Sequence, residues 1–168
     1  QGCRPIGLPM RVTGANRNML TSADDRPPME TLQELFDHAD PKERDRMQRN
    51  LFMGIAMDPL VDSAQAGDFL IRNIVGADPD RGAIAIGALL SEGQLVQFHV
   101  RDAASADEDL RAMLGPFGHK RYAGALLFSC NGRGTRMWDA PGHDVGVLQQ
   151  EVGALPVAGC FCAGEIGP

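Results

Sequence analysis

The sequence lacks any cluster of basic residues, and this excludes one broad class of function. Its 168 residues include 16 Lys and Arg against 22 Asp and Glu, which gives a formal net charge of -6 and a pI near 5.1. Nucleic-acid-binding surfaces need gathered Lys and Arg to displace phosphate counterions. The densest basic stretch, residues 42–49, is interleaved with acidic residues and is typical of a solvated helix face. We therefore expect no nucleic-acid partner.

Long apolar runs are also absent. The longest candidate, residues 83–90, contains a glycine and is far shorter than the roughly 20 apolar residues that a membrane-spanning helix needs. The first residues do not show the pattern of a signal peptide. We expect a protein without a membrane span that is located in the cytoplasm.

Cysteines are few, and their spacing does not suit a metal. The four cysteines, at positions 3, 130, 160 and 162, match no zinc pattern, and no pair of histidines lies near them in sequence. A chain of this length does not need disulfides to be stable. The glycine-rich segments match neither a Walker loop nor a dinucleotide fingerprint. We therefore expect no metal, no nucleotide and no other cofactor.

The composition that remains is that of an ordinary globular domain, with 43% hydrophobic and 23% charged residues. We expect one domain over residues 1–168. The sequence begins with Gln1 rather than Met, and it stops at Pro168, soon after an apolar segment. We expect it to be a piece of a longer chain.

The hydrophobic pattern predicts a mixed α/β (α+β) fold. A β-meander comes first and is followed by alternating helix and strand, so we expect a mixed β-sheet sandwich with helices packed on the sheet faces. In the strand at 94–100, Val96, Phe98 and Val100 share the face that we expect to be buried, whereas His99 is expected on a less apolar side. The predicted strands cover residues 10–13, 51–57, 69–75, 83–87, 94–100, 124–129 and 156–161, with a hairpin or loop at 14–28. The predicted helices begin at Pro28, after an Asp40 cap, at a Ser105 to Glu108 capping box, and near His143.

Two of the apolar strands end in residues that suit a binding site. Residues 124–129 run directly into Cys-Asn-Gly-Arg-Gly at 130–134, and residues 156–161 run into Cys-Ala-Gly-Glu at 162–165. If these strands are parallel neighbours, both loops emerge at the edge where open α/β sheets bind ligands. The alternative for the first loop is a plain tight turn, because Asn-Gly is an ordinary turn dipeptide.

The side chains in these loops predict an amino-acid-like or small carboxylate ligand. Arg133 offers a planar fork for a carboxylate, glycine-flanked backbone can offer N–H donors, and Glu165 could accept from an ammonium group. Arg72 lies among apolar residues of a strand, so it either faces solvent or reaches an anionic partner. The candidate ligand-binding residues are Arg72, Ser129, Cys130, Asn131, Gly132, Arg133, His143, Cys162, Gly164 and Glu165.

A cysteine-dependent enzyme is the alternative function. Cys130 would become a thiolate nucleophile if the loop placed it beside His143, with Asn131 available to orient it. Each residue also has a structural interpretation. Cys130 suits a small buried side chain at a strand end, and His143 with Asp144 suits the first turn of a helix, where the helix dipole stabilises the acid.

Several separate segments, in the same order, resemble the C-terminal half of FIST domain proteins. They are Gly-Ala-Leu-Leu-Phe-Ser-Cys-Asn-Gly-Arg-Gly at 124–134, His-Asp at 143–144, Leu-Gln at 148–149, Pro-Val-Ala-Gly-Cys-Phe-Cys-Ala-Gly-Glu-Ile-Gly-Pro at 156–168, and the stretches at 1–7, 69–76 and 96–102.

The resemblance implies a sensory, ligand-binding domain of bacterial signal-transduction proteins, rather than an enzyme. It implies a small-molecule ligand, which agrees with the chemistry of Arg133 and Glu165. It also implies that an N-terminal FIST half precedes this region and that more chain, such as a downstream signalling domain, follows it. If the pocket lies between the two halves, this chain would hold only part of it.

Overall fold

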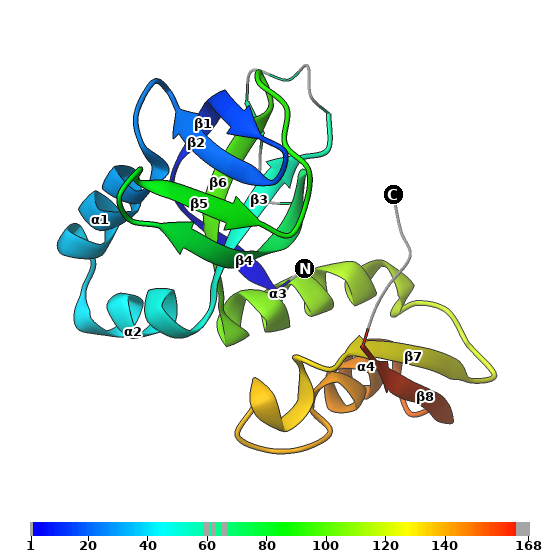
Figure 1. The fold of residues 1–168 in the computed structure, drawn as a ribbon. Coiled ribbons are helices and arrows are strands. Elements are labelled where there is room, and N and C mark those ends of the chain that lie inside the picture. The colour runs from blue at the N-terminus through cyan, green and yellow to red at the C-terminus, as the bar shows by residue number, and fades with distance from the viewer. Residues whose placement is uncertain (1, 59–60, 62, 65–66, 164–168) are drawn as a thin grey trace. The chain divides into compact units, whose positions relative to one another are not determined.

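The fold is described from a computed structural model, which describes all residues except 1, 59–60, 62, 65–66 and 164–168 (Figure 1). The chain divides into two compact units. One comprises residues 3–101, and the other comprises residues 1–2 together with 102–168. In the described part of the chain, no helix is both long and apolar enough to span a membrane.

The first unit is a closed six-stranded antiparallel barrel in the order β1-β2-β5-β4-β3-β6. The barrel closes because β1 is hydrogen-bonded to β2 along one edge and to β6 along the other. Register shifts within β1 let this long strand bend between its two partners. The strands are β1 (Cys3–Asn16), β2 (Met19–Ala23), β3 (Leu51–Ala56), β4 (Phe69–Asp78), β5 (Ala83–Ile86) and β6 (Leu95–Arg101).

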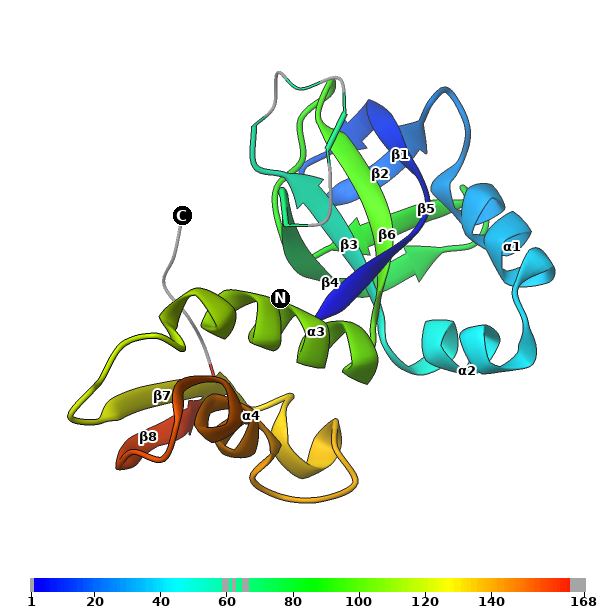
Figure 2. The same ribbon diagram turned by 180° about the vertical axis from the view of Figure 1, so that it is seen from behind.

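Alternating apolar residues fill the barrel. Val96, Phe98 and Val100 of β6 are buried as the sequence pattern predicts, and Met53 of β3 is fully buried. The helix α1 (Pro28–His38) packs one apolar face onto this core, close to β2 and β5 (Figure 2). The helix α2 (Pro41–Arg49) follows directly.

The start of α2 confirms a prediction from sequence. The Asp40 carboxylate accepts a hydrogen bond from the Glu43 backbone N–H at 2.9 Å, which satisfies one of the free donors of the first turn.

The expectation that His99 faces a less apolar side is wrong, because its ring is only 2% exposed. His99 meets the edge of the Phe69 ring at a centroid distance of 5.1 Å, and its Nδ1 lies 3.0 Å from the Gln97 carbonyl oxygen. Gly54 makes room for the ring, since a Cβ at that position would come within 2.5 Å of His99 Cε1. Burial lowers the pKa of His99 from its usual value, and the Gln97 carbonyl partly opposes this effect.

The second unit contains a two-stranded parallel sheet and two helices. The strands β7 and β8 pair residue by residue, from Ala125 opposite Val157 to Cys130 opposite Cys162, which confirms the expected parallel arrangement. The elements of this unit are α3 (Ala103–Leu114), the short 3-10 helix η1 (Gly115–Phe117), β7 (Ala125–Cys130), the 3-10 helix η2 (Gly134–Arg136), α4 (His143–Val152) and β8 (Val157–Cys162).

The helix α3 starts earlier than the predicted capping box. Its N-cap is Asp102, whose carboxylate accepts hydrogen bonds from both the backbone N–H and the hydroxyl of Ser105. Ser105 therefore lies inside the first turn rather than at the cap. Because Asp is as good an N-cap as Ser, the sequence offered two starts and the structure takes the first.

The mixed α+β class is confirmed. The strands of the meander close into a barrel, while the last two strands form a separate sheet with α4 against one face. Closure depends on the pairing of β1 with β6, whose residues are up to 98 positions apart, and the local strand pattern does not encode such a pairing.

Candidate functional site

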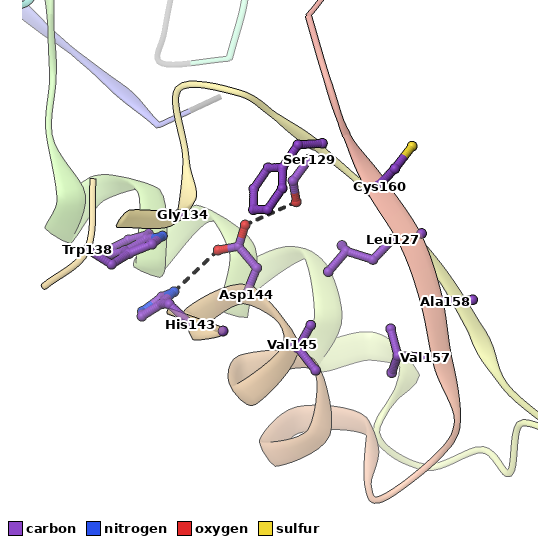
Figure 3. Close-up of a pocket in the computed structure, with 13 residues that line it drawn as sticks. Leu127, Ser129, Gly134, Trp138, His143, Asp144, Val145, Val157, Ala158 and Cys160 are labelled. Carbon is purple, nitrogen blue, oxygen red and sulfur yellow. Dashed lines mark hydrogen bonds and ion pairs between the residues drawn. The ribbon is translucent and has the colours of Figure 1, made fainter. Parts of the chain in front are cut away.

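A pocket of about 340 Å³ lies between the inner face of the β7–β8 sheet and the first turn of α4 (Figure 3). One end is apolar, and Leu127, Val145 and Val157 form its walls. The other end is polar, with Ser129, His143 and Asp144. The remaining lining residues are Gly134, Trp138, Gly142, Ala158, Gly159, Cys160 and Phe161.

A bidentate ion pair forms the base of the polar end. Arg133 donates from Nε to Asp144 Oδ2 at 2.6 Å and from Nη2 to Asp144 Oδ1 at 2.8 Å. The two side chains are only 18% and 10% exposed. The turn that precedes Arg133 sets its position, because the Arg133 backbone N–H donates to the Cys130 carbonyl and closes a β-turn. The tight-turn interpretation of this loop is therefore correct, and the turn also positions a charged side chain.

Asp144 is the centre of the polar cluster. Besides Arg133, it accepts a hydrogen bond from Ser129 Oγ at 3.2 Å, and its Oδ1 lies 3.3 Å from His143 Nδ1. Burial of the carboxyl raises its pKa, but the hydrogen bonds and the positive charge of Arg133 outweigh burial, so the pKa of Asp144 lies below its usual range. Asp144 is therefore ionised at neutral pH, and each carboxylate oxygen already has two partners.

His143 links the pocket to α3. Its Nε2 lies 3.0 Å from Asp107 Oδ1, a buried oxygen with no other partner, while Nδ1 faces Asp144. Trp138 stacks on the imidazole with the ring centroids 3.5 Å apart and the planes 12° from parallel (Figure 3). The Arg133 guanidinium lies 5.5 Å from the centroid of the Trp138 ring, within reach of a cation–π interaction. The stack holds the imidazole between two carboxylates.

Two glycines allow the pocket wall to form. Gly159 adopts φ +156°, and a Cβ there would come 1.8 Å from the Leu127 carbonyl oxygen on the paired strand. Gly134 adopts φ +67° and lies under the Phe161 ring, where a Cβ would approach Cζ to 3.0 Å. Any other residue at these positions would force the strands or the ring apart.

The structure brings three of the predicted residues together, namely Ser129, Arg133 and His143, around Asp144. Cys130 and Cys162 are register partners at the ends of β7 and β8. Side chains alternate along a strand, so Cys130 points to the face opposite Ser129. Of the remaining turn residues, Asn131 donates its backbone N–H to the Cys162 carbonyl, and Gly132 donates its backbone N–H to Cys130 Sγ at 3.4 Å.

The other three predicted residues are placed elsewhere or are not described. Gly164 and Glu165 lie outside the described residues, so their role stays a prediction. Arg72 belongs to the barrel unit, on β4, where its Nη1 donates to the Ile71 carbonyl at 3.0 Å.

The geometry gives no support to the pairing of Cys130 with His143 that a cysteine-dependent enzyme would need. Both ring nitrogens of His143 face carboxylate oxygens, and Cys130 Sγ accepts from the turn backbone. No interaction between the two side chains occurs in the described part of the chain. That role stays an untested alternative.

Three residues of the site were not among the predicted ligand-binding residues. Asp144 shows in the sequence only as an acid in the first turn of a helix. Asp107 lies on another helix, 36 positions before His143, and Trp138 lies in a segment without periodic pattern. The only available signal was that Trp138 is the single tryptophan of the chain. Among the described residues, no group of three or more His, Cys, Asp or Glu side chains is arranged to hold a metal ion.

Comparison with known proteins identifies the family. The FIST C domain matches residues 28–168, a range that includes parts of both compact units. Uncharacterized protein Mb0898c from Mycobacterium bovis is 45% identical over 171 residues, which cover 100% of this chain and 44% of the relative. Uncharacterized protein MT0656 from Mycobacterium tuberculosis is 46% identical over 176 residues, which cover 100% of this chain and 45% of the relative.

The chain thus spans less than half the length of these curated relatives. No solved structure gives a significant match. Because the family match extends over most of the sequence, the chain belongs to the FIST C domain family, a family of sensory-type domains.

Proposed function

We propose that the second unit binds a small molecule in the pocket between β7, β8 and α4, and that the protein acts as the sensory, non-enzymatic part of a bacterial signal-transduction protein. The observation that carries this proposal is the pocket itself. Its volume of about 340 Å³ lies at the lower end of the range for small-molecule sites, and apolar walls lead to a polar end. That combination suits a ligand with a short apolar body and a polar head.

The free hydrogen-bonding groups define the polar head. The Arg133 guanidinium already donates two hydrogen bonds to the Asp144 carboxylate. A ligand carboxylate would therefore have to displace Asp144 in order to bind Arg133. Ser129 Oγ donates to Asp144 and keeps lone pairs to accept from a ligand. Trp138 Nε1 is a buried donor without a partner, and a ligand oxygen would satisfy it.

A ligand with one acceptor and one donor next to an apolar side chain fits this pattern. An apolar amino acid has all three features, since its carboxylate accepts, its ammonium donates and its side chain fills the apolar end. The ligand class is therefore an apolar amino acid or a small carboxylate of similar size. Its carboxylate is placed toward Trp138 rather than on Arg133.

Ligand binding in the pocket can change the contacts that α4 makes with α3. His143 contacts Asp107 of α3, and Arg111 of the same helix donates to Glu151 of α4 at 2.9 Å. A ligand that reaches Trp138 Nε1 must move the indole, because this nitrogen is closed to solvent in the free protein. Movement of the indole changes its stack on His143 and thereby the contact with α3. The partner that receives the signal is the N-terminal FIST half or a downstream signalling domain, in the cytoplasm.

A thermal-shift screen against apolar amino acids and small carboxylates tests the proposal. A ligand present at a hundred times its Kd stabilises the folded state by about 2.7 kcal/mol, which raises Tm by roughly 5–10 °C. Val145→Phe fills the apolar end of the pocket and should abolish the shift. Val152→Phe is the matched control, because Val152 is on the same helix and half-buried but does not line the pocket. If no compound shifts Tm, or if Val145→Phe keeps the full shift, the pocket is not the binding site.

A further inference from the structure

The face of the β7–β8 sheet that lies opposite the pocket is apolar and open. Leu126 and Phe128 of β7 are 73% and 64% exposed. Their register partners on β8 are Ala158 and Cys160, which are exposed as well. We call these four residues the outer face. It joins two large apolar side chains and a thiol in one continuous patch on neighbouring strands.

A parallel sheet rarely has one apolar face exposed to solvent. Parallel sheets are normally buried on both faces, and an isolated pair of strands has little stability of its own. Here α4 covers only the inner face. Among the strands that the structure describes, β7 and β8 have only each other as neighbours, so each has one edge without a described strand partner. The sheet therefore has the features of the middle of a larger sheet.

The barrel of this chain is closed on itself. In the order of the described strands, each of its six strands already has a strand neighbour on both sides. The relatives do contain further polypeptide, because the matched region accounts for only 44% and 45% of their lengths. That flanking polypeptide makes up more than half of each relative.

We propose that, in full-length proteins of this type, the polypeptide flanking the matched region covers the outer face and adds a strand to at least one free edge of the β7–β8 sheet. The contact is apolar, with Leu126 and Phe128 as its centre, and backbone hydrogen bonds along the edge fix its register. The pocket lies on the α4 side of the sheet, and although Ala158 and Cys160 also line it, their side chains point away from α4 (Figure 3). The inference rests on these outward side chains and not on a ligand.

The experiment compares the 168-residue chain with a chimera. In the chimera, this chain replaces the matched region of the full-length mycobacterial relative MT0656. The readout is the rate at which a maleimide labels Cys160, measured by peptide mass spectrometry. We expect labelling of Cys160 in the chimera to be slower by about tenfold or more, because covering removes the thiol from solvent. Slower hydrogen exchange along β7 or β8 should accompany this and locate the added strand.

A double substitution on the outer face distinguishes loss of the contact with the flanking polypeptide from a general loss of stability. Leu126→Ser with Phe128→Ser should lower Tm of the chimera by several degrees and restore Cys160 labelling, yet leave Tm of the 168-residue chain unchanged. Leu89→Ser is the matched control, because Leu89 is 74% exposed in the barrel unit, and it should have the same small effect in both proteins.

Equal labelling rates in a folded chimera and in the 168-residue chain would overturn the proposal. Protection of Cys160 that instead rises with the concentration of the 168-residue chain would overturn it in favour of a second copy as the occupant. Slow labelling of Cys160 in the 168-residue chain at every concentration would also overturn it, because the barrel unit would then be what covers this face.

Discussion

Replacement of Asp144 tests whether the polar cluster holds the second unit together. Asp144→Ala removes the acceptor for two hydrogen bonds from Arg133 and one from Ser129, and it takes away the carboxylate next to His143. Breaking a buried ion pair from one side typically costs 3–5 kcal/mol, because the remaining charge stays buried without a partner. Since Arg133 keeps 18% of its side-chain surface, we take the lower end and expect a loss of about 3 kcal/mol.

The loss can be measured by urea unfolding followed through the fluorescence of Trp138, the only tryptophan of the chain, which lies in this unit. Asp144→Asn keeps the shape and one acceptor oxygen, so it should lose about 2 kcal/mol. Asp139→Asn is the control, since Asp139 is an exposed acid of the same loop, and it should change the free energy of unfolding by less than about 0.5 kcal/mol.

The dependence on pH gives a second signature of the same group. The folded-state pKa of Asp144 is below its ordinary value, so its contribution is complete above the ordinary pKa and is lost as pH falls through the folded-state pKa. The stability difference between the native protein and Asp144→Asn should therefore shrink below about pH 4. A loss under about 0.5 kcal/mol for Asp144→Ala at pH 7 would show that the polar cluster does not stabilise the second unit. A stability difference that stays constant down to about pH 2 would show the same of the ionised Asp144 carboxylate.

Three further predictions follow from single contacts. Gly159→Ala should prevent stable folding of the second unit, because the added Cβ would lie 1.8 Å from the Leu127 carbonyl oxygen, and limited proteolysis will show cleavage within residues 102–163. The barrel unit should lose stability as pH falls below about 6.5, since the buried His99 resists protonation that the unfolded chain accepts; this loss, measured by circular dichroism, should be absent in His99→Phe. Ser129→Ala should weaken ligand binding about tenfold by calorimetry, because the ligand donor loses its acceptor, and it should lower stability by about 1.5 kcal/mol, because Asp144 loses one hydrogen bond.

The elements of the fold were largely predictable because their causes are local. Alternating apolar residues mark the strands, and the Asp40 cap marks the start of α2. The closure of the barrel was not predictable, because it rests on the pairing of β1 with β6 across most of that unit. The burial of His99 was missed for a similar reason. On its own strand His99 shares a face with the polar residues Gln97 and Arg101. The residues that enclose its ring, Gly54 and Phe69, come from β3 and β4.

In the candidate site, too, the features with local causes were predictable from the sequence, and those that depend on distant residues were not. The two parallel strands and the turn that carries Arg133 follow from local sequence, and the structure places them as expected. The partner of Arg133 does not follow from local sequence, because an acid in the first turn of a helix has a sufficient local reason to be there. Only the packing of α4 on the sheet turns Asp144 toward Arg133 and Ser129. The sequence therefore predicted where the site lies, but it suggested that the Arg133 guanidinium is free to bind a ligand. In the structure, Asp144 already binds it.

A fluorescence titration of Trp138 shows directly whether the pocket binds a small molecule. The indole lines the pocket and stacks on His143, so an occupant must change its emission. We expect a saturable change with apolar amino acids or small carboxylates, with one ligand per chain. Val145→Phe should remove this change, and Val152→Phe should keep it. Ligands that raise Tm but leave the emission of Trp138 unchanged would contradict binding in the pocket, because binding would then occur elsewhere in the protein.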